Sequence, residues 1–364
     1  MKVLYLINFA GKAGTEKYVE NLVRILGKDR ITPYFAYNVP GELSEKLEAM
    51  GVPCLQLNMG KAALLSAARE LACYCRENEI DVIHAQYPRE NIVALLAKKH
   101  YKNLKVVLTN HLTLRLSGAS GAMWKLLNRH FTPKNHRIIA VCNEGRDIML
   151  QNGVAADRIQ VVYNGIEPSG APEKNRAVAH ELGLDDRCFV FTILARYAPE
   201  KGLDFLLDSL AALKGKTERP FCCLICGDGD GFSAITSKIE AMQLQPFCRQ
   251  LGYRTDVPQI LLSSDAYLCS SSCNEAMSFA ILEAMNAALP LVVTDVGGNR
   301  DLAETGIKCG FVLDFGDVDG FAGAMLTLME DSALYQSYSK NATLKIEQSF
   351  DLYKLANDVF ETYK

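Results

Sequence analysis

A strand, a helix and a second strand between residues 265 and 298 constrain the fold of this chain more than any other segment. Asp265–Ser271 (DAYLCSS) and Leu291–Asp295 (LVVTD) are short apolar runs of the kind that form buried strands. The residues between them that recur at helical spacing are Phe279, Leu282, Met285 and Asn286. Because consecutive strands joined by a helix run parallel, the segment predicts part of a parallel sheet covered by helices.

The helix of this unit is expected to begin at Ser278, because a serine at the N-cap can accept a hydrogen bond from a backbone N–H in the first turn, such as that of Ala280. Ligands of open parallel sheets bind at the carboxyl ends of the strands, where this helix starts. The N–H groups of Ser278, Phe279 and Ala280, together with the helix dipole, therefore predict a binding site for a phosphate group.

Two carboxylates flank this predicted phosphate site. Glu275 precedes the helix, and Glu283 lies within it on a different face from the apolar residues. Carboxylates repel phosphate, so we expect both to accept hydrogen bonds from hydroxyl groups. A sugar nucleotide, which carries a diphosphate between two polyols, has the matching chemistry.

The same alternation of strands and helices runs through most of the chain and predicts an α/β protein. We expect strands at residues 2–9, 32–38, 53–57, 81–85, 105–109, 137–142, 159–162, 189–194, 221–226 and 248–251. Asn164–Asn175 (NGIEPSGAPEKN) interrupts the pattern with proline, glycine and charged residues, as a linker does. A chain of 364 residues is also long for one core, which favours two domains.

Composition excludes several classes of protein. The net charge of −3 indicates no nucleic-acid surface. The N-terminal apolar run is too short to span a bilayer and is followed at once by glycine, so we expect no signal peptide and no membrane span. The 12 cysteines are expected to be reduced. Cys222, Cys223 and Cys226 lie in the apolar run FCCLIC, where core packing is favoured over zinc binding.

Two cations follow the strand expected at residues 189–194, in the segment ARYAPEKG (195–202). Arg196 offers a two-pronged donor and Lys201 a mobile point charge, and both suit the negative charge of a diphosphate. This RxxxEKG element, the Glu-x7-Glu spacing of Glu275 and Glu283, and Gly14 in KAGTEK together resemble the motifs of family 4 glycosyltransferases. The resemblance covers nearly the whole chain.

The resemblance implies the GT-B fold, in which two Rossmann-like doubly wound domains face each other across a cleft. It implies an acceptor-side domain over residues 1–168, a sugar-nucleotide-binding domain over 169–349, and a terminal helix at 350–364 that packs back on the first domain. The family transfers sugar with retention of configuration and without a metal, and the departing phosphate takes the proton of the acceptor. Nucleotide sugars are its donors, and UDP is favoured here.

The family resemblance also implies roles for individual residues. His111 and Glu275 would lie at the transferred sugar, and Glu283 would hold the ribose. The further donor-binding residues would be Gly14, Arg196, Lys201, Gly227, Tyr253, Arg254, Ser278, Phe279 and Ala280. Thr15 and His84 would lie on the acceptor side.

The chain departs from the family pattern at three positions. Ala13 stands in place of the first of two adjacent glycines, Ala276 in place of a glycine after Glu275, and Gln86 in place of a histidine after His84. Ala13 and Ala276 leave open the alternative of a protein that binds a sugar nucleotide without catalysis. A sugar-nucleotide epimerase of the same fold is another alternative.

The segment GDGDG (227–231) suggests two other classes. Asp228 and Asp230 form an Asp-x-Asp pair, the metal-binding pattern of the other major glycosyltransferase fold, and the glycines resemble half of a dinucleotide fingerprint. No acidic residue ends a clear second strand about 20 residues later, which disfavours a nicotinamide enzyme.

We therefore predict a metal-independent retaining glycosyltransferase that moves a hexose-type sugar to a glycan or lipid-linked acceptor. The common family role implies synthesis of surface polysaccharide or glycolipid. We expect a cytoplasmic protein, either free or peripheral on the inner face of the membrane. A cationic amphipathic patch could touch anionic lipid, although a solvated helix with a core tryptophan is the simpler interpretation. The patch consists of Trp124, Lys125, Arg129, His130 and Lys134.

Overall fold

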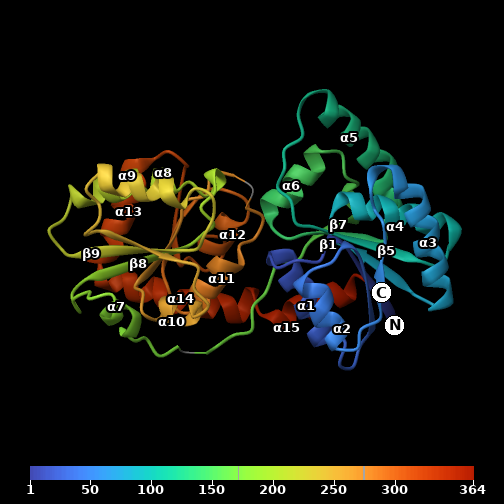
Figure 1. Cartoon of the computed structure of the whole chain (residues 1–364), viewed down its shortest axis with the longest axis horizontal. Coiled ribbons are helices and arrows are strands. Elements are labelled where there is room, and N and C mark those ends of the chain that lie inside the picture. The colour runs from blue at the N-terminus through green and yellow to red at the C-terminus, as the bar shows by residue number, and fades with distance from the viewer. Residues whose placement is uncertain (171, 274) are drawn as a thin grey trace. The chain divides into compact units, whose positions relative to one another are not determined.

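The computed structural model describes residues 1–170, 172–273 and 275–364, and places the chain in two compact units. Unit 1 comprises Met1–Asn164 and Leu352–Lys364, and unit 2 comprises Gly165–Asp351. Each has a parallel sheet with helices on both faces, so the α/β class is confirmed (Figure 1). The first boundary lies four residues before the one expected at 168, and the last lies two residues after the one expected at 349.

Unit 1 has a seven-stranded sheet in the order β3-β2-β1-β4-β5-β6-β7. Its strands are β1 (Lys2–Phe9), β2 (Thr32–Val39), β3 (Cys54–Gln56), β4 (Val82–Ala85), β5 (Lys105–Asn110), β6 (Arg137–Ala140) and β7 (Ile159–Val161). Its α-helices are α1 (Gly14–Leu26), α2 (Glu42–Ala49), α3 (Leu64–Glu77), α4 (Pro88–His100), α5 (Gly118–Phe131), α6 (Asn143–Gln151) and α15 (Leu352–Glu361). Val3–Leu6 of β1 are fully buried, as a strand covered on both faces requires.

Unit 2 has a six-stranded sheet in the order β10-β9-β8-β11-β12-β13. Its strands are β8 (Phe189–Leu194), β9 (Phe221–Cys226), β10 (Cys248–Gly252), β11 (Ala266–Cys269), β12 (Leu291–Thr294) and β13 (Gly310–Leu313). Its α-helices are α7 (Ala177–Glu181), α8 (Leu203–Lys214), α9 (Phe232–Ala241), α10 (Val257–Leu262), α11 (Phe279–Asn286), α12 (Asn299–Ala303), α13 (Val318–Glu330) and α14 (Ser332–Ser349). Residues 299–349 contain α12, β13, α13 and α14, which the sequence did not predict.

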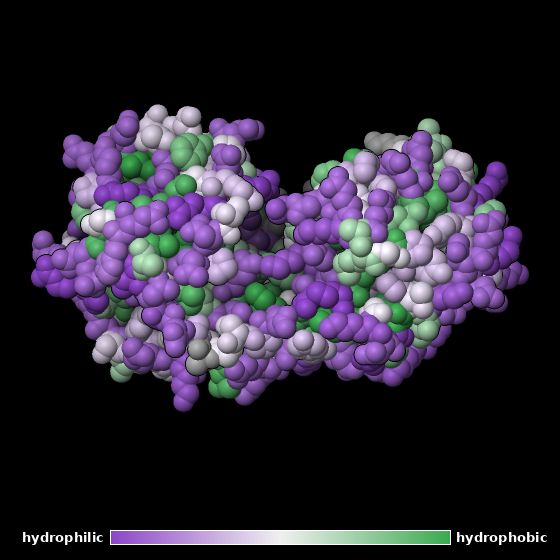
Figure 2. Space-filling view, turned by 60° about the horizontal axis from the view of Figure 1, so that its bottom comes forward, coloured by the Kyte–Doolittle hydropathy of each residue, from purple (hydrophilic) through white to green (hydrophobic). Residues whose placement is uncertain are grey.

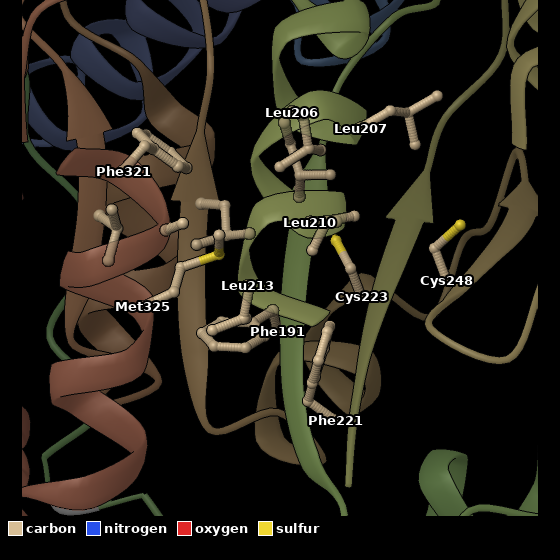
Figure 3. Packing of buried hydrophobic residues seen from close by; sticks show 14 of the residues in the cluster. Phe191, Leu206, Leu207, Leu210, Leu213, Phe221, Cys223, Cys248, Phe321 and Met325 are labelled. Atoms are coloured by element: carbon tan, nitrogen blue, oxygen red, sulfur yellow. The ribbon is translucent and has the colours of Figure 1, made fainter. Parts of the chain in front are cut away.

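One core cluster of unit 2 lies between its sheet and the pair α8 and α13, and a second one combines residues of β8 and β9 with α7 and α10. Leu206, Leu210 and Leu213 of α8 belong to one cluster with Phe191 of β8 and Met325 of α13, and Leu213 lies beside the Phe191 ring (Figure 3). Cys223 and Cys248 are part of this core, and burial raises the pKa of both thiols. The cysteines of this region are therefore packing residues, and all 12 are free thiols.

The expected linker is a segment docked on unit 2. The amide of Asn286, at the end of α11, donates to the carbonyl oxygen of Glu167 at 3.1 Å and accepts from the backbone N–H of Ser169 at 3.0 Å. The backbone N–H of Asn175 donates to the carbonyl oxygen of Leu262 at 3.1 Å. Residue 171 lies outside the described residues; on either side of it, hydrogen bonds hold the expected linker on unit 2, so the described parts are not a free tether.

On the face drawn in Figure 2, hydrophilic residues cover most of each unit, with apolar residues scattered among them. Within the described residues, no helix is both long enough and apolar enough to cross a membrane.

Candidate active site

The loops that follow β8 and β11 are joined to each other at the carboxyl edge of the unit 2 sheet. The hydroxyl of Ser270 donates to the carbonyl oxygen of Lys201 at 2.8 Å. The backbone N–H of Ser272 donates to the carbonyl oxygen of Glu200 at 2.9 Å. Gly202 has a φ of +62°, and a Cβ atom there would overlap the carbonyl oxygen of Ser270. Glycine is therefore required where the two loops touch.

Lys201 and Glu275 form an ion pair between these two loops. The Lys201 side chain is 23% exposed and the Glu275 side chain 10% exposed. The hydroxyl of Ser271 donates to Glu275 Oε1 at 2.8 Å, so this carboxylate oxygen has two donors. The predicted phosphate clamp and the predicted sugar-binding carboxylate are thus in direct contact, which the sequence analysis did not foresee.

The loop after β12 supports Glu275 from the other side. Gly297 has a φ of +61°, and a Cβ atom there would overlap the carbonyl oxygen of Glu275. The backbone N–H of Gly298 donates to the carbonyl oxygen of Ala276 at 2.7 Å. The hydroxyl of Thr294 donates to the carbonyl oxygen of Ser271 at 2.6 Å. Three adjacent strand ends therefore hold one carboxylate.

Sequence reasoning missed Ser271 and Thr294 as parts of the site. Ser271 is one of three consecutive serines, and its hydrogen bond to the Glu275 carboxylate distinguishes it from its neighbours. Thr294 ends an apolar strand that was interpreted only as packing. The Gly-Gly pair at 297–298 was the available signal, because such a pair follows a strand where another backbone comes close.

Arg196 differs from Lys201 in its surroundings. Its side chain is 73% exposed and pairs with Glu200 at 2.9 Å, one helical turn away in the same loop. An exposed pair of this kind contributes little to stability. The guanidinium can therefore exchange this partner for a bound anion at small cost.

Helix α11 starts as predicted, but its capping differs. Ser278 is the N-cap residue, and Phe279 is the first residue of the helix. The expected hydrogen bond to the Ser278 side chain is wrong, since within the described residues that side chain makes no capping bond. Glu283 is half-buried in the second turn, while Ile281 and Leu282 pack into the core.

Gly227 follows β9 with a φ of +147°, where a Cβ atom would overlap the carbonyl oxygen of Ala195. Its position at the strand end agrees with the sequence prediction, and its conformation explains the need for glycine.

Tyr253 and Arg254 follow β10 and have different surroundings. Tyr253 is 65% exposed. Arg254 donates two bonds of 2.7 Å to the carboxylate of Asp256 and pairs with Glu181 at 3.2 Å. These acceptors raise the pKa of the guanidinium. Arg254 thus links α7 to the start of α10 and has a structural role that the sequence analysis did not assign.

In unit 1, Gly14 is the exposed first residue of α1. Thr15 is buried, and its hydroxyl lies 2.6 Å from that of Tyr87. Glu16 is also buried, and burial raises the pKa of its carboxyl, although hydrogen bonds from the backbone of Gly11 and Ala13 oppose this. A carboxylate therefore already accepts N–H groups of the loop before α1.

His111 follows the end of β5 next to three polar or aromatic side chains. Its Nε2 lies 3.0 Å from the Oε1 of Gln86. Its ring packs edge-on against Tyr18, with 4.9 Å between ring centroids, and lies 5.7 Å from the ring of Tyr87. Burial lowers the pKa of His111 to about 3, so the ring is neutral at neutral pH. A neutral ring can donate or accept a hydrogen bond but brings no positive charge.

His84 is not accessible to an acceptor in this structure. It is fully buried, with Nδ1 2.7 Å from the hydroxyl of Tyr363 and Nε2 2.7 Å from that of Thr109. Burial lowers its pKa to about 3. His84 joins the C-terminal residues to the sheet of unit 1, and this packing role replaces the predicted acceptor-side role.

Asp228 and Asp230 do not form part of a metal cluster in the part of the chain that the structure describes, where no group of three or more potential ligands comes together. The carboxylate of Asp228 accepts from the backbone N–H of Gly229 at 2.8 Å, which fits a turn residue.

Two Rossmann-like units, with a cation, a buried carboxylate and a helix N-terminus at one sheet edge, match the arrangement expected of a glycosyltransferase of the GT-B fold. Residues 175–345 match the model of glycosyl transferases group 1, and residues 13–169 match that of glycosyltransferase family 4. The chain therefore belongs to the family 4 glycosyltransferases, as its motifs predicted.

Relatives and solved structures are similar over most of the chain. The chain is 27% identical to the Escherichia coli UDP-Gal:alpha-D-GlcNAc-diphosphoundecaprenol alpha-1,3-galactosyltransferase, over 88% of this chain and 84% of the relative. It is 24% identical to the Bacillus anthracis N-acetyl-alpha-D-glucosaminyl L-malate synthase, over 82% and 78%. The crystal structure of Anabaena HepE in complex with UDP has a TM-score of 0.86 at 23% identity and covers 100% of this chain and 99% of that one.

Proposed function

We propose that this glycosyltransferase moves a hexose-type sugar from a nucleotide-diphosphate sugar, with UDP as the favoured nucleotide, to a glycan or lipid-linked acceptor. The observation that carries the proposal is the ion pair of Lys201 and Glu275 beside the N-terminus of α11. Cation, helix N–H groups and carboxylate offer separate partners for the diphosphate and for sugar hydroxyls. The UDP complex of HepE and the UDP-sugar in the name of the Escherichia coli relative support this choice of donor.

The residues of unit 2 would bind the donor in three parts. Arg196, Lys201 and the N–H groups of Ser278–Ala280 would hold the diphosphate, because they place positive charge where the leaving group becomes negative. Glu283 would accept the ribose hydroxyls. Glu275 would accept a hydroxyl of the transferred sugar, held in position by Ser271.

We propose that transfer retains the configuration at the anomeric carbon. The acceptor oxygen forms a bond to the anomeric carbon while the bond between that carbon and the diphosphate oxygen breaks. The electron pair of the broken bond leaves with the nucleoside diphosphate. The acceptor proton passes to the departing phosphate oxygen. A separate general base is then unnecessary, which agrees with the pKa of about 3 of His111, because a ring with so low a pKa is a weak base. His111 would hydrogen-bond the transferred sugar or the phosphate.

Surface polysaccharide or glycolipid synthesis is the setting we propose, at the cytoplasmic side of the membrane. Helix α5 offers a surface for a peripheral contact, because Met123 is 57% exposed and Leu126 is 68% exposed. Arg129 and His130 are exposed in its last turn. Apolar side chains bordered by cations suit an anionic lipid surface.

The first test screens UDP-, GDP- and ADP-sugars by thermal shift, since a ligand of the native state raises its melting temperature. The donor so identified is then incubated with candidate acceptors, and products are separated by mass. A transferase releases nucleoside diphosphate in proportion to glycosylated acceptor. A new sugar nucleotide would indicate an epimerase, and binding without either product would indicate a non-catalytic protein. Glu275→Gln is the matched inactive control.

A further inference from the structure

Unit 1 contains a cavity of about 620 Å³ that no residue of the proposed donor site in unit 2 lines. It is bounded by the ends of β1 and β5 and by α4, α5 and α6. Its volume is that of a site for a small molecule or for part of a larger one.

One side of the cavity is polar and adjoins the unit 1 site residues. Asn8 at the end of β1, Glu16 in the first turn of α1 and Asn110 at the end of β5 line this side. Tyr87 lines it as well and touches both Thr15 and His111. Tyr87 therefore links the cavity to His111, which we propose contacts the transferred sugar or the phosphate.

The charges on this side favour hydroxyl groups over phosphate. Glu16 and Glu90 both line the cavity, and burial raises the pKa of both carboxyls. Among the described lining residues Arg89 is the one cation, and its guanidinium already donates to the carbonyl oxygen of Met59. Carboxylates and amides pair readily with hydroxyl groups, whereas an anion beside two carboxylates would be repelled.

Helices α5 and α6 line the cavity mainly with apolar side chains, although Asn128 of α5 and Asn152 after α6 line it as well. Trp124, Leu127 and Phe131 of α5 line it together with Ile148 and Met149 of α6. Trp124 is half-buried and lines this cavity. It is therefore neither a fully buried core residue nor a surface residue of the predicted lipid-binding patch.

Apolar residues also stand at the opening. Leu112 is 42% exposed and Leu114 is 53% exposed, although both line the cavity. The segment that carries them is held in place, because the amide of Asn152 donates to the carbonyl oxygen of Leu114 at 3.0 Å. Exposed apolar side chains on a fixed segment leave a surface that an apolar ligand would cover.

We propose that this cavity binds the first part of the hydrocarbon chain of a lipid acceptor, with the hydroxyl-bearing head at the polar side beside His111. The proposal rests on the proposed function and narrows its acceptor from glycan or lipid to a lipid. The cavity holds only part of a long chain, and the remainder leaves past Leu112 and Leu114.

The test measures binding of methyl, hexyl and octyl β-glucoside by calorimetry, below the micelle concentration and without any donor. Burial of a methylene contributes about 0.8 kcal/mol, so affinity should rise about three- to fourfold for each added methylene until the cavity is full. Equal affinity for methyl and octyl glucoside would overturn the proposal.

Two adjacent leucines provide matched variants. Leu127→Trp narrows the cavity and should weaken octyl glucoside binding at least tenfold. Leu126→Trp changes an exposed neighbour that does not line it and should leave binding unchanged. Equal losses in both variants would mean that the chain binds the outer surface of α5, and would refute the cavity site.

A second pair uses exposed positions, where folding tolerates change. Leu114→Asp at the opening should weaken octyl glucoside binding, whereas Leu150→Asp, exposed but outside the lining, should not. Another outcome would overturn the proposal: the wild-type protein binds no octyl glucoside and forms a dimer, and Leu114→Asp makes it monomeric. The occupant of the cavity would then be a second copy of this chain.

Binding without donor separates this inference from the proposed function. A protein that binds octyl glucoside in the cavity yet transfers no sugar to any acceptor keeps the cavity site and loses the transferase proposal. Transfer to a soluble glycan with no dependence on chain length keeps the transferase and overturns the lipid site.

Discussion

The ammonium group of Lys201 lies against the carboxylate of Glu275, and the pair joins two loops whose residues are 74 positions apart in the sequence. Both side chains are largely enclosed, so each satisfies the other's charge in the free protein. A bound diphosphate would form an ion pair with Lys201, and a hydroxyl of a bound sugar would donate a hydrogen bond to Glu275. The pair therefore keeps two donor-binding groups in position before the donor arrives.

Replacing Lys201 should weaken donor binding more than replacing Arg196. Lys201→Ala removes a partly enclosed cation that is already positioned, and we expect nucleoside diphosphate affinity to fall by about 10- to 100-fold, as loss of a charge-assisted bond implies. Arg196→Ala alone should cost less, and the double variant should show no binding by calorimetry. Arg187→Ala, an exposed arginine paired with Asp185 outside the proposed site, is the control. Unchanged affinity in the double variant would refute the clamp.

Glu275→Gln should separate binding from turnover. The amide keeps the size of the side chain and an acceptor oxygen but removes the charge that faces Lys201. We expect turnover to fall by two or more orders of magnitude while nucleoside diphosphate still binds. Steady-state rates and calorimetry on the same preparation check this, with Glu240→Gln, at an exposed position of α9, as a surface control. Wild-type turnover in this variant would refute the proposed role of Glu275 in the reaction.

Ser271→Ala tests a positioning role. The serine is 2% exposed, and its hydroxyl donates to Glu275 at 2.8 Å. Loss of this bond should lower kcat about tenfold with little change in nucleoside diphosphate affinity, and Ser271→Thr should restore part of the rate if the methyl group fits. A fall in melting temperature with normal kcat would indicate that Ser271 acts only in folding.

The buried histidine His84 should make the free energy of unfolding depend on pH. Its pKa is about 3 in the folded protein, below the ordinary value of 6.5, so the unfolded chain binds an extra proton between these values. Stability should therefore rise with pH through this window, by about 1.4 kcal/mol per pH unit from this residue. Urea unfolding between pH 4.5 and 7.5 should show a shallower slope for His84→Gln than for the wild type, although the variant is less stable throughout. Parallel slopes would contradict the assignment.

Metal removal should leave activity intact. The proposed charge stabilisation uses Arg196, Lys201 and helix N–H groups, which do not depend on a divalent ion. Turnover in EDTA should equal that in magnesium, and Asp228→Asn with Asp230→Asn should respond in the same way. Loss of activity in EDTA that magnesium restores would direct attention to these two aspartates.

The sequence by itself determined the alternation of strands and helices, because buried parallel strands need continuous apolar runs. Lys2–Phe9, Phe189–Leu194 and Phe221–Cys226 have the same bounds in the structure. It also determined which strand ends carry polar and charged residues, since these interrupt the apolar pattern. Arg196, Lys201, Glu275 and the start of α11 were found in this way.

Only the tertiary structure decided which of these residues touch. The contact between Lys201 and Glu275 depends on β8 and β11 being neighbours in the sheet, and this order is set by packing over the whole unit. The same holds for His84, whose two ring nitrogens are engaged by residues 25 and 279 positions away. The unit 1 cavity likewise lies between elements that only packing brings together. Local sequence sets the conformation of each segment, but contacts between distant segments follow from burial of the common core.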